Sequence, residues 1–191
     1  LPKVDGAFIK SFGIDSGTEE DFKADLKKQM ERELSSALKN MNKTKVFDAL
    51  VEANGETPVP TSAITAEVQT LKKQAAERFG GGQQFDVNQL PDELFTEQAE
   101  RRVRLGVLLG ATVKALELKP EDARIKSLID EMASAYDDPD EVVNFYYSNE
   151  DNLRQIGALA VEEQVAEKLL EKASLKPIDM SYSDVMKNRQ S

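Results

Sequence analysis

Apolar residues recur every three or four positions along most of the chain, which is the period of an α-helix. Thr18 and the acidic residues after it form a helix-start signal, because threonine caps helices and acidic side chains favour the first turn. From there the apolar stripes run through Phe22, Leu26, Met30, Leu34, Leu38 and Met41, and then through Val46, Phe47, Leu50 and Val51. No glycine or proline interrupts the sequence before Gly55. The pattern predicts one continuous helix from about Glu19 to Ala53.

The length of that helix bears on the shape of the molecule. At 1.5 Å per residue it spans about 50 Å, whereas a compact globule of this chain length has a diameter of about 40 Å. We therefore expect an elongated molecule with long, protruding, arm-like helices. A thin body has little interior, so part of its apolar residues is expected on grooves or in a dimer interface.

Prolines and glycines divide the rest of the chain into further helices. These are predicted over residues 60–79, 91–113, 120–136, 139–147, 152–173 and 182–186, with a short segment over 4–12 at the start. Apolar residues surround the helix between Leu105 and Val113, which predicts that this part is buried. Gly106 and Gly110 stand four apart, a spacing that predicts a tight helix crossing. Only residues 175–178 hint at a strand, so the predicted class is all-α, with antiparallel helices joined by short connections.

The composition removes most enzyme chemistry. The 191 residues include neither histidine nor cysteine, which excludes Ser-His-Asp and Cys-His catalysis, Cys/His zinc sites, disulfides and haem or iron–sulfur ligation. The 35 acidic residues exceed the 25 basic ones, and the net charge of -10 argues against nucleic acids and membranes as direct partners. No apolar run is long enough to span a membrane. The first residue is leucine rather than methionine, so we expect a piece of a longer protein.

The polar motifs of the chain favour structural explanations over chemical ones. Glycines 80–82 follow a predicted helix, so they predict a helix end and not a phosphate cradle. The Glu–Arg pairs at i,i+4 within residues 97–104 are expected to neutralise each other instead of clamping a phosphate. The acidic residues within 137–141 are expected to cap a helix instead of binding calcium. We expect neither a cofactor nor a metal site.

Methionine and aromatic residues remain as candidate binding residues. Together they can form an adaptable apolar surface that accepts many partners. For each of them, packing into the core is the competing interpretation, and the sequence leaves it open. The candidates are Met132, Tyr136, Val142, Phe145 and Tyr146 around a helix–turn–helix, with Phe79 and Phe85 at a second loop.

Several longer strings, in continuous register along nearly the whole chain, carry a resemblance to a known family. They include Gln74-Ala75-Ala76-Glu77-Arg78-Phe79-Gly80-Gly81, Leu90-Pro91-Asp92-Glu93-Leu94-Phe95, Gly106-Val107-Leu108-Leu109-Gly110 and Glu131-Met132-Ala133-Ser134-Ala135-Tyr136. These strings resemble the C-terminal domain of bacterial trigger factor. The chain departs from the family at residues 82–85 and 157–160.

The resemblance implies an ATP-independent, ribosome-associated chaperone of the bacterial cytoplasm, whose partners are unfolded and nascent polypeptides. It implies one all-helical chaperone domain over residues 1–191, with two arm-like projections around a cradle. In that family the ribosome-docking and peptidyl-prolyl isomerase domains precede this region. The chain itself is therefore expected to be no enzyme, and to reach the ribosome only through the missing N-terminal domain. By position, the client-binding residues fall on Met132, Tyr136, Val142 and Phe145.

Two other functions stay open at this point. A helical structural or adaptor domain would have one specific, saturable protein partner and no effect on unrelated unfolded proteins. An enzyme that uses carboxylates alone would have a concave site with a strongly perturbed Asp or Glu pKa. Whether the chain forms a homodimer also stays open.

Overall fold

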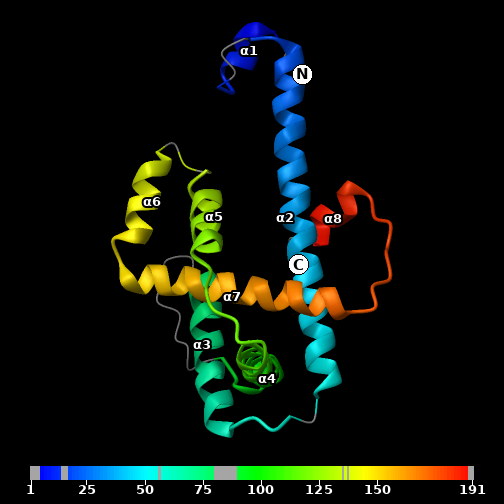
Figure 1. The fold of residues 1–191 in the computed structure, drawn as a ribbon, viewed down its shortest axis with the longest axis vertical. Helices are drawn as coiled ribbons and strands as arrows, with labels where there is room; N and C mark the ends of the chain where they lie inside the picture. The colour runs from blue at the N-terminus through cyan, green and yellow to red at the C-terminus, as the bar shows by residue number, and fades with distance from the viewer. Residues whose placement is uncertain are drawn as a thin grey trace. The chain divides into compact units, whose positions relative to one another are not determined.

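Helices form all the regular secondary structure in the described part of this computed structural model, which comprises residues 5–13, 17–55, 57–79, 90–134, 136 and 138–188. The predicted all-α class is therefore confirmed (Figure 1). The chain divides into two compact units, Leu1–Thr44 with Lys176–Ser191, and Lys45–Leu175. The helices are α1 (Gly6–Lys10), α2 (Glu19–Ala53), α3 (Thr61–Phe79), α4 (Glu93–Ala115), α5 (Asp122–Ala133), α6 (Pro139–Tyr147), α7 (Glu150–Lys172) and α8 (Tyr182–Asn188).

Helix α2 has the bounds that its apolar stripe predicts. Its 35 residues begin after Thr18, whose hydroxyl oxygen accepts a hydrogen bond from the backbone N–H of Asp21 at 3.2 Å. Three acidic residues occupy its first turn, where their negative charge interacts favourably with the positive end of the helix dipole. The helix starts in the first unit and ends in the second. The elongated shape expected from its length stays a prediction.

The first unit is built from α1, the first part of α2 and α8. The rings of Phe8 and Phe12 lie 4.9 Å apart between centroids, and Phe12 lies 5.5 Å from Phe22 of α2. Further along α2, Ala37 is buried, as is Val185 of α8, and α8 runs beside α2 (Figure 1). Aromatic rings therefore cover the start of the α2 stripe within this unit and α8 lies against its later part, while Leu26 and Met30 between them stay exposed.

The second unit has two clusters of buried side chains. In the first, Phe47 of α2 packs with Val165 and Ala166 of α7, and half-buried residues of α4 surround them. In the second, α3 and α4 share a cluster of Val68, Leu71, Ala99, Ile64 and Phe95. Helix α7 also packs against α4, α5 and α6. The predicted antiparallel packing of consecutive helices is seen in the α5–α6 pair, whereas α4, which is viewed end-on in Figure 1, packs across α3.

Two predictions about local structure are wrong. The apolar part of α4 is half-buried, and on one side only, because its neighbours partly cover Leu105, Leu109 and Val113 while Val107 stays exposed. Within the described ranges no tight crossing is found at Gly106 and Gly110, since a side chain added at either position would meet no atom within 4 Å. Residues 175–178, where the sequence only hints at a strand, have no regular structure, in keeping with the predicted all-α class. No helix in the described ranges combines the length and the hydropathy that a membrane span requires.

Candidate functional site

Five of the predicted binding residues belong to the hairpin of α5 and α6, two helices that pack against each other (Figure 1). Helix α5 ends at Ala133, and α6 begins after Asp138. The Oδ1 atom of Asp138 accepts a hydrogen bond from the backbone N–H of Glu141 at 3.2 Å, as the sequence predicts for a capping residue. Pro139 then occupies the first helical turn, where its missing N–H costs nothing.

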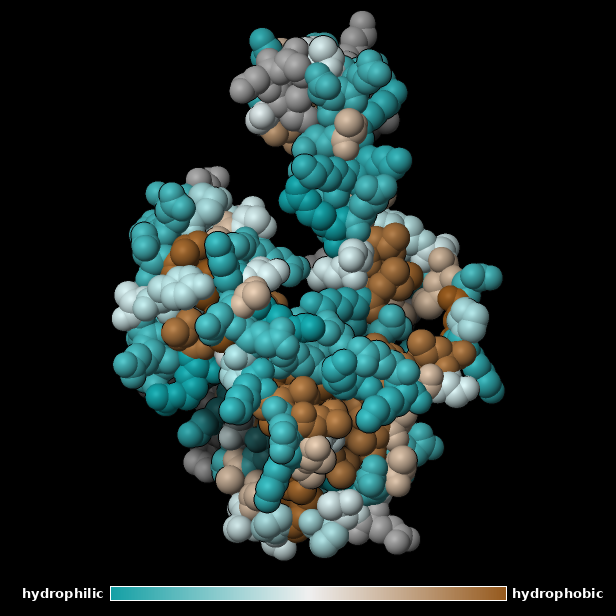
Figure 2. All heavy atoms as spheres, viewed as in Figure 1, coloured by the Kyte–Doolittle hydropathy of each residue, from teal (hydrophilic) through white to brown (hydrophobic). Residues whose placement is uncertain are grey.

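Three side chains of this hairpin present apolar surface to solvent. Met132, Tyr136 and Phe145 are 39%, 62% and 60% exposed. Val142 and Tyr146 are half-buried, so each of them contributes partly to core packing, the competing interpretation of the sequence analysis. The rings of Phe145 and Tyr146 meet edge to face, with centroids 5.5 Å apart. Figure 2 shows hydrophobic residues at the surface where α5 and α6 lie. We call Met132, Tyr136 and Phe145 the hairpin surface.

The second predicted loop site stays a prediction. Phe79 is the last residue of α3, and its side chain lies outside the described residues. Phe85 and the glycines at 80–82 lie outside them altogether.

The hairpin is fastened to α7 through α5. The guanidinium of Arg124 donates two hydrogen bonds to the carboxylate of Glu167, at 2.9 and 2.7 Å. These bonds raise the pKa of Arg124 above its already high ordinary value, so this side chain is always charged. Buried Ile129 of α5 and Ile156 of α7 add apolar packing in the same unit. These contacts hold α5, the helix that carries Met132, against α7.

An apolar groove that the sequence analysis missed lies where α7 meets the start of α5. Its volume is about 630 Å³, and it is lined by Pro120, Ile125, Leu153, Gly157, Ala158 and Val161, with Glu150 and Arg154. A side chain added at Gly157 would lie 3.7 Å from Pro120, so the glycine leaves room there. The signal that could have found the groove is Gly157, a glycine inside the helix predicted over residues 152–173.

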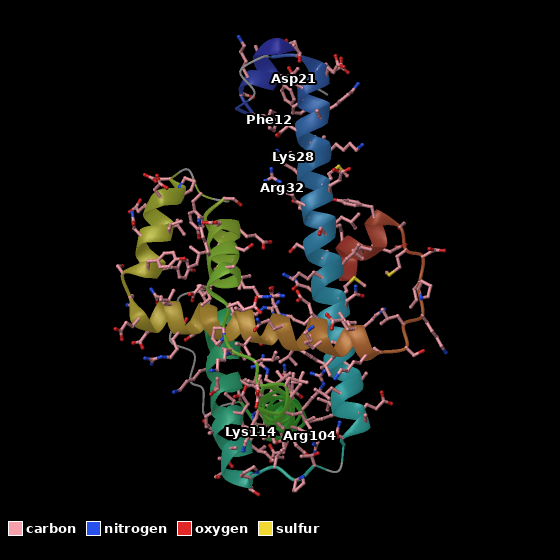
Figure 3. The ribbon with its side chains drawn as sticks, in the orientation of Figure 1. Phe12, Asp21, Lys28, Arg32, Arg104 and Lys114 are labelled. Carbon is pink, nitrogen blue, oxygen red and sulfur yellow. The ribbon has the colours of Figure 1, made fainter. Side chains whose placement is uncertain are left out.

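The first unit also exposes apolar residues outside the predicted set. Phe12 is exposed beside the first turns of α2, where Asp21 lies (Figure 3). Leu26 and Met30 of α2 are exposed as well. The stripe that predicts α2 correctly as a helix did not show that part of it would remain uncovered.

The arginines within residues 97–104 form ion pairs with carboxylates of α2, α3 and α4. Arg104 pairs with Glu100 one turn earlier, as predicted, and Figure 3 marks its position on α4. Arg101 instead forms an ion pair with Asp48 of α2, so its predicted pairing with Glu97 is wrong. Arg102 pairs with Glu67 of α3 at 3.0 Å. Because a carboxylate holds each of the three arginines, the arrangement favours helix packing over a phosphate clamp. Among the described residues no acidic cluster is arranged to hold a metal ion.

Comparison with known proteins places these features in a family. The family model described as "Bacterial trigger factor protein (TF) C-terminus" matches residues 18–171. The chain is similar to the trigger factor of Tolumonas auensis, with 47% identity over 186 residues that cover 97% of this chain and 42% of that protein. It is also similar to the trigger factor of Chromohalobacter salexigens, with 45% identity over 190 residues that cover 100% of this chain and 42% of that protein. The chain thus spans less than half the length of these relatives.

Proposed function

Because the chain belongs to the trigger factor family and corresponds to the C-terminal part of its members, we propose that it is an ATP-independent chaperone module. It binds hydrophobic segments of unfolded or nascent polypeptides in the cytoplasm. Ribosome docking and peptidyl-prolyl isomerase activity then belong to the parts of the relatives that this chain does not span. The module itself carries out no covalent chemistry.

The observation that carries this proposal is the exposure of Met132, Tyr136 and Phe145 on the hairpin, whose helix α5 is bound to α7 by charged hydrogen bonds. Large apolar side chains that a fold leaves in water are available to bury a partner's apolar residues. A methionine and two aromatic rings adapt to many partner shapes, which suits clients of unrelated sequence. Further exposed apolar residues, such as Met30 and Phe12, allow one client to bind at several points, so that avidity strengthens weak individual contacts.

The test is the suppression of aggregation. An unrelated, chemically denatured protein is diluted into buffer without ATP, and light scattering is followed with and without stoichiometric chain. The parent chain is expected to suppress the scattering. The combined Met132→Glu and Phe145→Glu variant is expected to need about tenfold more protein for the same effect, because a charged side chain cannot replace the lost apolar contact.

The matched control is the Ser127→Glu and Asn144→Glu variant, which adds the same charge at exposed polar positions of the same two helices. It is expected to behave as the parent does, and circular dichroism checks that all variants fold. Equal loss in both variants would show an effect of charge alone and would contradict the proposed surface. No suppression by the parent would favour the alternative function, a helical adaptor domain with one specific partner.

A further inference from the structure

Helix α6 is held in the molecule by apolar contacts of modest size. None of its nine residues is buried. Val142, Val143 and Tyr146 are half-buried and form its inner side. Among the described residues, the side-chain hydrogen bonds of α6 stay within its own turns, at Asp138 and Ser148, and no ion pair ties it to another helix. The helix is thus attached by one apolar stripe and by its two chain connections.

The surface beneath α6 is more apolar than the surface that α6 exposes. Ile129 and Ala133, in the second half of α5, are completely buried. Helix α7 meets the first turns of α5. There Arg124 of α5 binds Glu167 of α7, and a side chain added at Gly157 of α7 would lie 3.8 Å from Ile125 of α5. Beyond that point α6 runs alongside α5 (Figure 1). Helix α6 therefore packs along the half of α5 that carries the buried Ile129 and Ala133.

The two contacts of α5 differ in strength. The contact with α7 combines apolar burial with a bidentate arginine–carboxylate pair, which is among the stronger polar contacts in proteins. The contact with α6 has no such bond among the described residues, and an isolated helix of nine residues is unstable in water. Local opening begins at the segments with the fewest buried contacts. Within the hairpin, that segment is α6.

We propose that α6 is a removable cover, and that a client segment folding as a short amphipathic helix takes its place on α5, against Ile129 and Ala133. This inference rests on the proposed function and deepens it. Helix α6 itself shows the chemistry that fits: two adjacent β-branched residues and an aromatic residue three positions later, on one face of a helix. Because the tethered α6 competes with the client, the apparent affinity is reduced by the fraction of molecules that are open.

Hydrogen exchange followed by mass spectrometry distinguishes this mechanism from binding on a fixed surface. The probe is a short synthetic peptide with the apolar spacing of α6 but other residues around it, and the control peptide has serines at the apolar positions. The probe is expected to lower the protection of the α6 amides while the α5 amides stay protected. Increased protection of α6 would overturn the inference and leave the proposed function intact. Absence of any binding by the probe or by unfolded proteins would refute both.

The affinity of a variant for the probe peptide also distinguishes displacement of α6 from binding on a fixed surface. Val143→Ser weakens the inner side of α6 without touching the hairpin surface, and it is expected to bind the probe peptide about fivefold more tightly. The matched control, Asn144→Ser, alters an exposed position of the same helix and is expected to bind as the parent does. Unchanged or weaker binding by Val143→Ser, with exchange in α5 and α7 as in the parent, would overturn the inference.

Discussion

Replacing Phe47 by alanine is expected to lower the free energy of unfolding of the second unit by about 3–5 kcal/mol. Phe47 is only 5% exposed and packs with Val165 and Ala166 of α7. Half-buried side chains of α4, among them Leu105 and Leu109, complete its surroundings. Truncation would remove the apolar contacts of the ring and leave a cavity that rigid helices on several sides cannot fill.

Urea unfolding followed by circular dichroism measures this effect, and hydrogen exchange in α4 and α7 assigns it to the second unit. The matched control is Phe145→Ala, the same substitution at a ring that is 60% exposed, for which a loss below about 1 kcal/mol is expected. Equal losses at the two positions would contradict the placement of Phe47 in the core.

Replacing Asp92 by alanine is expected to destabilise the second unit by about 1–3 kcal/mol. The Nζ atom of Lys72 on α3 lies 2.6 Å from Oδ1 of Asp92, immediately before α4. Lys72 is almost completely buried, whereas Asp92 is half exposed. Removing the carboxylate would leave a buried ammonium group without its charge partner.

The opposite substitution is expected to have a different outcome. Lys72→Met removes the buried charge, keeps most of the volume, and leaves Asp92 in contact with water, so the stability is expected to stay within about 1 kcal/mol of the parent. Thermal and urea unfolding of the two variants measure the asymmetry. A larger loss of stability for Lys72→Met than for Asp92→Ala would contradict this expectation. It would show that the attraction between the two charges outweighs the cost of burying the lysine.

Local rules predict that each helix of this chain exists, although some bounds differ: α5 ends at Ala133 and not at residue 136. The bounds of α2 follow from an uninterrupted apolar stripe and from Thr18, and the start of α6 follows from Asp138 and Pro139. Each of these signals lies within a few residues of the feature it sets. Contacts between helices were harder to predict from the sequence. Arg101 pairs with Asp48, which is distant in sequence, and not with Glu97, which lies one turn away.

The candidate site was predictable only in part, because exposure depends on what covers each helix face. Met132 and Ala133 are neighbours at the end of α5, yet one is exposed and the other is completely buried. Gln164 shows the reverse case: a polar residue buried in α7, whose Oε1 has no hydrogen-bond partner among the described residues. Hydropathy along the chain carries no information on either outcome, since both depend on neighbours that are distant in sequence.

The central claim is that clients bind at the hairpin of α5 and α6. The five methionines of the chain, at positions 30, 41, 132, 180 and 186, allow a direct test. With ¹³C-labelled methionine methyl groups, each position gives its own NMR signal, and single Met→Leu variants assign them. The titrant is an unlabelled, reduced and alkylated disulfide protein, which stays unfolded without denaturant.

We expect the methyl signal of Met132 to shift or broaden at the lowest client concentrations, before the signals of Met41 and Met186. The Phe145→Glu variant is expected to require about tenfold more client for the same change. A Met132 signal that stays unchanged while the signals of Met30 or Met180 respond would contradict the account and place the binding surface outside the hairpin.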